Sequence, residues 1–221
     1  MEKFYKIFRA GFFPPKVVLQ SNSGPAPLIT ISREMGSGGK STANLIASQL
    51  GEPWKVYDHE LIDKIAKNKK LEEELIESID PKRLPLVDII TTKTFGKRFS
   101  HLSGYQRHLI KVMTLVGLKG YSIILGRGAN FLFPHALNIR IICLFDQRII
   151  WQMTYEHISR PEAIKRIEDS DKERREFVES LFNHNNTKAY HYDLVIRTGP
   201  NISIEDAANI TIDLTKRKFK V

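Results

Sequence analysis

The stretch from Leu28 to Thr42 constrains the fold more than any other part of the chain. It begins with a short apolar run, Leu28 to Ile31, that is typical of a buried strand. A loop rich in glycine follows, and then a helical pattern that is closed by Gly51. A strand, a glycine loop, the pair Lys-Ser and a helix, in this order, form the context of a loop that wraps around phosphate groups.

Such a loop binds anions for a direct physical reason. Glycines let backbone N–H groups turn toward the anion, and the N-terminus of the next helix adds the positive end of its dipole. We expect Lys40 to reach the β- and γ-phosphates and the Ser41 hydroxyl to bind Mg²⁺. The residues predicted to form the nucleotide site are Gly36, Ser37, Gly38, Gly39, Lys40, Ser41, Thr42 and, from the last strand, Arg197.

The loop departs from the standard spacing G-x-x-x-x-G-K-[ST] at one position, where Glu34 replaces the first glycine. Two explanations stay open. Arg33 balances the charge of Glu34, or the loop binds its phosphates in a different way. The alternative without function is a glycine-rich turn that only caps a helix.

Composition narrows the class of protein. A chain of 221 residues with 42% hydrophobic content suits one α/β domain, with room for a mobile subdomain. Its net charge of +9 fits anionic partners: nucleotides, nucleic acid or an acidic membrane surface. The single cysteine, Cys143, excludes an intrachain disulfide and favours the cytoplasm. No apolar run reaches the length of about 18 residues that a membrane span needs.

Residues 1–27 are predicted to be an extension and linker outside the main domain. The first 13 residues interleave basic and aromatic side chains, and two prolines and a Ser-, Asn-, Gly- and Pro-rich segment follow. They lack the apolar run of a secretory signal. The extension either binds a membrane surface or partner, or packs on the domain or on a second subunit. We favour packing, which leaves a homodimer open.

Four predicted strands end in polar residues. Asp58 follows the second strand, 54–57, and could also cap the helix after it. Arg127 lies between two glycines after the strand 121–125, which suits phosphate binding or a tight turn. Asp146 follows the strand 139–145 and is either a Mg²⁺ ligand or part of a helix cap. Arg197 follows the last strand, 192–196.

The remaining segments are predicted to be mainly helical. Residues 64–77 are a solvated helical face, 108–119 an amphipathic helix, and 205–214 a closing helix. Residues 81–101 are basic and rich in hydroxyls, and either grip a phosphorylated acceptor or form a mobile surface loop. Residues 159–182 are predicted to be an exposed, charged helical hairpin.

Strands that alternate with helices predict an α/β fold with a central parallel sheet. The phosphate loop, Asp58, Arg127 and Arg197 all fall at carboxyl ends of strands. Since those ends share one edge of a parallel sheet, we expect these residues to converge there.

At this point the chain resembles the cytidylate-kinase-like family of P-loop kinases. The resemblance runs from about Leu28 to the last helix and rests on five stretches in order, each weak alone. They are Ile-Thr-Ile-Ser-Arg-Glu-Met-Gly-Ser-Gly-Gly (29–39), Tyr57-Asp58, Ile-Leu-Gly-Arg-Gly-Ala-Asn (124–130), Asp-Lys-Glu-Arg (171–174) and Tyr-Asp-Leu-Val-Ile (192–196).

The resemblance implies a three-layer P-loop NTPase-type fold, with an acceptor-binding helical insert at about 68–120 and a helical lid at about 156–185. It implies phosphoryl transfer from ATP, with Mg²⁺, to a small phosphorylated acceptor such as a nucleoside monophosphate. By position, Asp58 would lie near the acceptor and the metal waters, and Arg127 would bind the acceptor phosphate. Arg174, oriented by Asp171, would close over the transferred group. Catalysis would rest on Lys40, Asp58, Arg127 and Arg174.

Two further departures bear on specificity. Cytidylate kinases have Gly-Arg-Asp where this chain has Gly-Arg-Gly at 126–128. Their lid pattern Arg-Asp-x-x-Asp-x-x-Arg here begins with Ile-Glu at 167–168, although Arg166 is adjacent and is assigned to the acceptor site. The kinase class is therefore predicted without cytidine specificity.

Three functions compete. The first is an ATP-dependent kinase of a nucleotide or of another small molecule. The second is a nucleotide-binding regulatory module without acceptor-dependent turnover. The third is a nucleic-acid-binding protein, which only the net charge favours, since we find no recognition motif. We favour the kinase and expect no specific nucleic acid partner.

Overall fold

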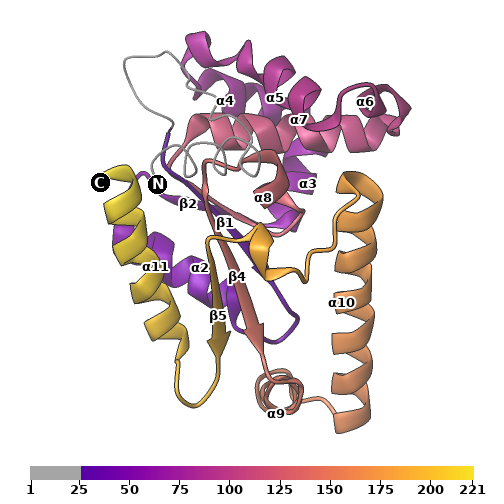
Figure 1. The fold of residues 1–221 in the computed structure, drawn as a ribbon, viewed down its shortest axis with the longest axis vertical. Coiled ribbons are helices and arrows are strands. Elements are labelled where there is room, and N and C mark those ends of the chain that lie inside the picture. Colours follow the sequence, from indigo (N-terminus) through magenta and orange to yellow (C-terminus); the bar gives the residue numbers. More distant parts are fainter. Residues whose placement is uncertain (1–25) are drawn as a thin grey trace, which may run out of the picture.

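A computed structural model describes residues 26–221 (Figure 1). The predicted extension at 1–27 lies almost wholly outside the described residues. The elements occur in the following order: β1 Leu28–Arg33, α2 Gly39–Leu50, β2 Lys55–Tyr57, α3 His59–Lys67, α4 Lys69–Glu77, η1 Pro81–Arg83, α5 Leu86–Phe95, α6 Arg98–His101, α7 Gly104–Lys119, β3 Ser122–Leu125, α8 Ala129–Leu132, β4 Leu137–Cys143, α9 Phe145–Glu156, α10 Arg160–Phe182, η2 Ala189–His191, β5 Leu194–Thr198 and α11 Ile204–Phe219.

The five strands form one sheet in the order β2-β3-β1-β4-β5, and every neighbouring pair is parallel. Strand β1 is central, with Ile29 opposite Ile123 on one side and Leu137 on the other. Parallel strands need helical crossovers, which cover both faces of the sheet, so the strands read as continuous apolar runs. The predicted α/β fold with a central parallel sheet is confirmed.

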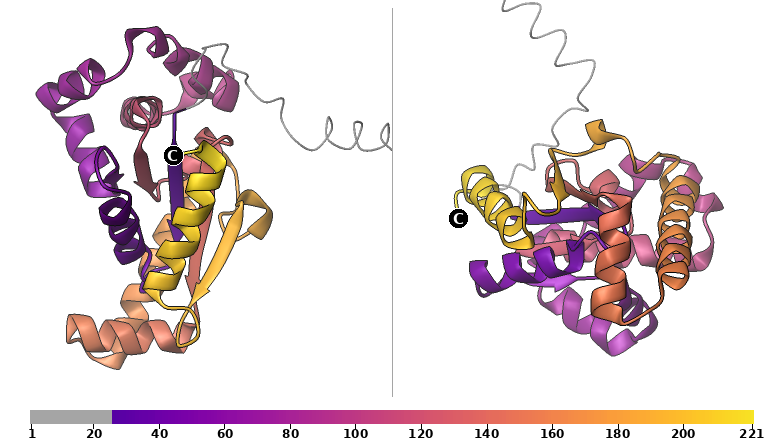
Figure 2. Two further views of the ribbon diagram at one scale, coloured as in Figure 1. Left: turned by 90° about the vertical axis from the view of Figure 1, so that its left-hand side faces the viewer. Right: turned by 90° about the horizontal axis from the view of Figure 1, so that it is seen from below.

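Two hydrophobic cores lie on the two faces of the sheet and give the fold its three layers (Figure 2). Successive strand side chains point to opposite faces. Leu28 and Ile124 therefore pack with α3 to α8 and the end of α10, whereas Ile29 and Ile123 pack with α2 and α11. Helices α2 and α11 lie against each other on that second face.

The helical insert is built around α7. Ser103 and Gln106 form a capping box at its start, and nine of its residues from Leu109 to Leu118 are buried. Helices α3, α4 and α5 pack against it. The mobile-loop alternative for residues 81–101 is wrong, because this segment forms η1, α5 and α6.

Two other expectations need correction. The predicted hairpin at 159–182 is a single helix, α10, because Ser159 caps its start and the only turn residue, Asn183, comes at its end. The strand predicted at 139–145 is β4, which begins and ends two residues earlier, and Phe145 already belongs to α9.

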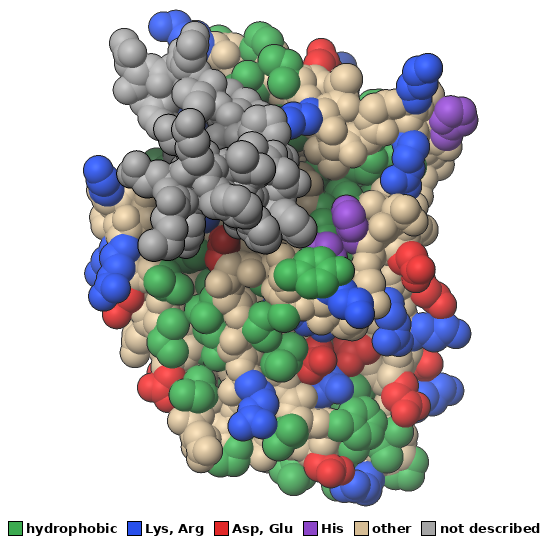
Figure 3. All heavy atoms as spheres, in the orientation of Figure 1, with side chains coloured by type: hydrophobic (Ala, Val, Ile, Leu, Met, Phe, Trp, Pro, Cys, Tyr) green, Lys and Arg blue, Asp and Glu red, His purple; other side chains and the backbone are tan. Residues whose placement is uncertain are grey.

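The outer face of α10 explains why its sequence is so charged. Acidic and basic side chains alternate over this helix on the surface shown in Figure 3. They include i, i+4 pairs between Glu162 and Arg166 and between Lys172 and Glu176. Such a face is solvated, and each exposed pair contributes only about 0.3–0.5 kcal/mol.

Candidate active site

The glycine loop between β1 and α2 has the backbone of a phosphate-binding loop. Gly36 and Gly38 adopt positive φ angles of 73° and 78°, which side chains disfavour. Gly38 is the N-cap of α2 and supplies no side-chain acceptor. The first N–H groups of α2 therefore have no side-chain cap, which leaves the helix N-terminus available to an anion.

Three hydroxyls donate to backbone carbonyls of the loop and of the neighbouring strand β4 rather than facing a ligand. Ser37 is fully buried, and its hydroxyl donates to the carbonyls of Glu34 and Ile141. Thr198 donates to the carbonyl of Ser37 from β5. The Thr42 hydroxyl, which we assigned to the nucleotide, donates to the Gly38 carbonyl at 3.0 Å. Ser41 is exposed at the start of α2.

Glu34 has a structural role that explains the unusual loop. Its carboxylate accepts a hydrogen bond from the N–H of Cys143 at 3.0 Å. It also pairs with the buried side chains of Arg140 at 3.8 Å and Arg148 at 3.9 Å. The suggestion that Arg33 balances Glu34 is therefore wrong, because arginines from β4 and α9 do so.

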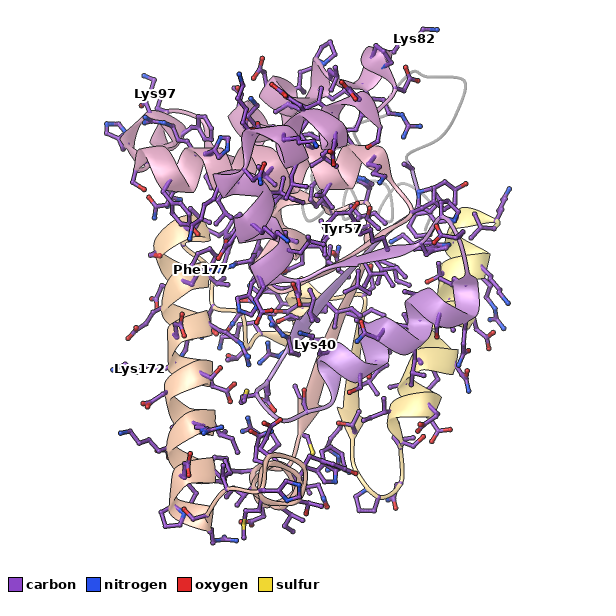
Figure 4. The ribbon with its side chains drawn as sticks, turned by 180° about the vertical axis from the view of Figure 1, so that it is seen from behind. Lys40, Tyr57, Lys82, Lys97, Lys172 and Phe177 are labelled. Carbon is purple, nitrogen blue, oxygen red and sulfur yellow. The ribbon has the colours of Figure 1, made fainter. Side chains whose placement is uncertain are left out.

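Lys40 meets Asp58 across the mouth of the site. Their charged groups lie 3.1 Å apart, and Lys40 lies at the start of α2 near the middle of Figure 4. Asp58 also caps α3 by accepting from the N–H of Leu61. Burial acts to raise the pKa of Asp58, but the N–H of Leu61 and the ammonium of Lys40 outweigh it and hold that pKa below its usual value. Both predicted roles of Asp58, cap and site residue, are compatible with this geometry.

Arg127 occupies a sharp turn after β3. Gly126, Arg127 and Gly128 all have positive φ angles, of 85°, 57° and 69°. For the arginine this conformation costs about 1 kcal/mol or more, and such strain gathers at functional sites. The Arg127 guanidinium pairs with Asp63 at 2.7 Å and stacks on the Phe177 ring at 4.8 Å.

Asp171 ties α10 to the phosphate loop. One carboxylate oxygen accepts from the N–H of Met35 at 2.7 Å, and the other pairs with Arg148. Arg174 lies 3.5 Å from the same carboxylate. Burial is the main cause that lowers the pKa of Arg174. The predicted orientation of Arg174 by Asp171 agrees with this contact, although its catalytic role stays a prediction.

A pocket of about 110 Å³ lies between the strand ends and α10. Its lining consists of Ser32, Arg33, His59, Gly126, Arg127, Gly128, Asn130, Ser170, Glu173, Arg174, Phe177, Val178 and Asn186. The structure thus brings Arg127 and Arg174 together, with Asp58 next to the lining residue His59. Partial desolvation, Arg127 and Arg33 lower the pKa of His59, which favours its neutral form at pH 7.

Three predicted residues lie outside this pocket. Arg166 is exposed on α10 and pairs with Glu162 at 2.6 Å. Asp146 is exposed in the first turn of α9 and pairs with Arg160 at 3.3 Å. Arg197 is exposed within β5. Their assigned functions stay predictions.

Among the lining residues that sequence reasoning did not assign to the site are Arg33 and Asn130. Both belong to stretches that carry the family resemblance, at 29–39 and 124–130, but we assigned neither of them to the binding site. Their position in those stretches is the only signal that could have singled them out.

The fold and the loop together define the class of protein. A parallel sheet in the order 2-3-1-4-5, with a Gly-Gly-Lys-Ser loop between β1 and α2, is a P-loop kinase fold. The family model described as "Cytidylate kinase-like family" matches residues 28–200. The chain therefore belongs to the cytidylate kinase-like family, which supports phosphoryl transfer as its class of reaction.

One solved structure supports the fold, and a second is more distant. An uncharacterized protein from Eubacterium ventriosum ATCC 27560 superposes with a TM-score of 0.59 at 20% identity, over 86% of this chain and 98% of that one. Shikimate kinase from Bacteroides thetaiotaomicron gives a TM-score of 0.43 at 12% identity, over 88% and 99% of the two chains. No curated protein matches the chain. Within residues 26–221, no helix is both long and apolar enough to cross a membrane.

Proposed function

We propose that the protein transfers the γ-phosphoryl group of ATP to a small phosphorylated acceptor, with nucleoside monophosphates as the first class to test. The contact between Lys40 and Asp58 carries this proposal. This contact joins the lysine of the phosphate loop to the residue that follows β2, next to the lining residue His59. ATP in the loop and an acceptor in the pocket would therefore meet at this contact.

Each side chain then has a task that its surroundings support. Lys40 would exchange Asp58 for the β- and γ-phosphates when ATP binds. Asp58, ionised because of its low pKa, would hold the attacking oxygen of the acceptor. Arg174 would reach the equatorial oxygens of the transferred group from α10. Phosphoryl transfer needs this positioning and positive charge more than it needs a covalent intermediate.

Magnesium would be bound chiefly through the nucleotide. The described part of the chain has no group of three or more His, Cys, Asp or Glu side chains that could hold a metal ion. This suits Mg²⁺, which keeps several waters and takes only one or two protein ligands beside substrate phosphates. The Ser41 hydroxyl and, through water, Asp58 are the groups that fit. When bound, Mg²⁺ neutralises charge on the phosphates.

The proposal is tested by ADP release from ATP and Mg²⁺ against a panel of nucleoside monophosphates and small non-nucleotide acceptors. We expect one acceptor to raise ADP release at least tenfold. Lys40→Ala should abolish that increase, because the phosphate loop loses its only lysine. Lys172→Ala is the matched control, since this lysine points into solvent from α10 (Figure 4).

Two outcomes would point elsewhere. ATP binding without turnover on any acceptor would favour a regulatory nucleotide-binding module. Binding of mixed DNA or RNA that weakens steeply with salt would favour a nucleic-acid function, since neutralised phosphates release counterions.

A further inference from the structure

The Arg33 side chain enters the pocket between two glycines. A Cβ atom at Gly39 would lie 2.6 Å from Cβ of Arg33, and one at Gly126 would lie 2.0 Å from its Nη1 atom. The stem of Arg33 therefore runs along the phosphate loop, and its guanidinium covers the turn after β3. Glycine at both positions makes the room for this arginine.

Arg33 differs from the other two arginines of the pocket in its partners. Arg127 pairs with Asp63, and Arg174 pairs with Asp171. Within residues 26–221, the Arg33 guanidinium has neither a hydrogen bond nor a carboxylate within 4.0 Å. Burial and the charges of Arg174 and Arg127 lower the pKa of Arg33 to about 9. It is therefore still a cation at neutral pH, and it could bind an anion without giving up an ion pair.

Two more donors in the same pocket have no partner. The Nδ2 atom of Asn130 and the Nε atom of Arg127 are buried without a hydrogen bond. Asn130 is only 8% exposed, and an unpaired polar group at such a site costs about 1–3 kcal/mol. These two atoms are donors only, and so are the nitrogens of the Arg33 guanidinium. A ligand that satisfies Asn130, Arg127 and Arg33 together must present several oxygen acceptors.

The chemistry of these donors selects a phosphate group. Arginine forks match phosphate oxygens two at a time, and a dianion offsets a partly buried cation that has no ion-pair partner. Arg127 is paired with Asp63, so Arg33 is the arginine of the pocket that has no ion pair, and only the more distant carboxylates of Asp58 and Asp171 attract it.

We propose that Arg33 and Asn130 are acceptor-binding residues, which together with Arg127 bind the phosphate group that the acceptor already carries. This inference rests on the proposed function, because it assigns the pocket to the acceptor. It adds two ligands for the phosphate group of the acceptor, Arg33 and Asn130, to the proposed Arg127.

The test is a calorimetric titration of inorganic phosphate into protein that is saturated with a non-hydrolysable ATP analogue and Mg²⁺. The analogue fills the phosphate loop, so the added phosphate reports on the pocket. We expect the wild type to bind one phosphate, and Arg33→Gln and Asn130→Asp each to weaken it at least tenfold. Arg33→Lys keeps the charge but loses the forked guanidinium, so its phosphate affinity should lie between that of the wild type and that of Arg33→Gln. Lys172→Gln, which removes a solvated charge from α10, should change phosphate affinity less than twofold.

Affinity for the ATP analogue separates this inference from the proposed function. It should stay within threefold of wild type in all these variants. Three results would overturn the inference. They are an unchanged phosphate affinity in Arg33→Gln, no phosphate binding by the wild type, and variants that lose affinity for the analogue and for phosphate equally. If the wild type binds no analogue, the proposed function fails. Phosphate is then titrated into protein that carries Lys40→Ala, alone and combined with each of the variants above. The inference still requires the same ranking of phosphate affinities. Sulfate and acetate titrations distinguish a phosphate site from a general oxyanion or carboxylate site.

Discussion

The N–H of Met35 donates to the carboxylate of Asp171 at 2.7 Å, although 136 residues separate them. One belongs to the phosphate loop and the other to α10, the predicted lid. The same carboxylate pairs with Arg148, whose side chain is only 9% exposed. The position of the loop therefore depends on the helix that covers the pocket.

Asp171→Asn should lower the free energy of unfolding by about 1–3 kcal/mol, because a buried arginine loses its anionic partner. The amide can still accept from Met35, so the fold should persist. Urea denaturation measures the change. Lys172→Gln, one residue along α10 on its solvated side, should stay within about 0.5 kcal/mol of wild type. Equal stability of Asp171→Asn and wild type would show that the Arg148 pair contributes nothing.

Glu34→Gly restores the standard glycine of the loop and should nevertheless harm the protein. Arg140, Arg148 and the N–H of Cys143 would all lose an acceptor, at an expected cost of about 1–3 kcal/mol. Denaturation of Glu34→Gly beside Glu34→Gln measures this. The amide of the second variant can still accept from Cys143, so it should be the more stable of the two. A more stable Glu34→Gly variant would contradict the structural role of Glu34.

His59 should make stability depend on pH. Burial, Arg127 and Arg33 hold its folded pKa below the unfolded value of about 6.5, so the unfolded chain binds more protons as pH falls through that value. Stability that is present above this value should be lost at lower pH. On going from about pH 7.5 to pH 5.5, the wild type should lose more free energy of unfolding than His59→Gln. His135 and His191 also have lowered pKa values, but they are common to both proteins. Parallel curves for the two proteins would contradict this role for His59.

The fold could be predicted largely from local patterns. Short apolar runs at 28–31 and 121–125, each followed by glycines, indicated buried parallel strands whose ends share an edge. The loop with Lys40 was predictable for the same reason, since its glycines, lysine and helix start lie within a few residues of one another.

The remaining features depend on contacts between distant segments. Glu34 meets Arg140 and Arg148, more than a hundred residues away, and no local pattern pairs them. Arg33 enters the pocket because Gly39 and Gly126 make room from two different elements. The extent of α10 was predicted, but not that it is one continuous helix, because few of its residues are buried and its apolar periodicity is weak.

The central claim is transfer of a phosphoryl group to an acceptor that the pocket binds. The most direct measurement is ³¹P NMR of ATP and Mg²⁺ mixed with the wild type and the acceptor that most increases ADP release. Our account predicts that ADP and a phosphorylated acceptor appear in equal amounts, with neither formed by Lys40→Ala. ADP with inorganic phosphate alone, at the same rate whether or not an acceptor is present, would contradict it.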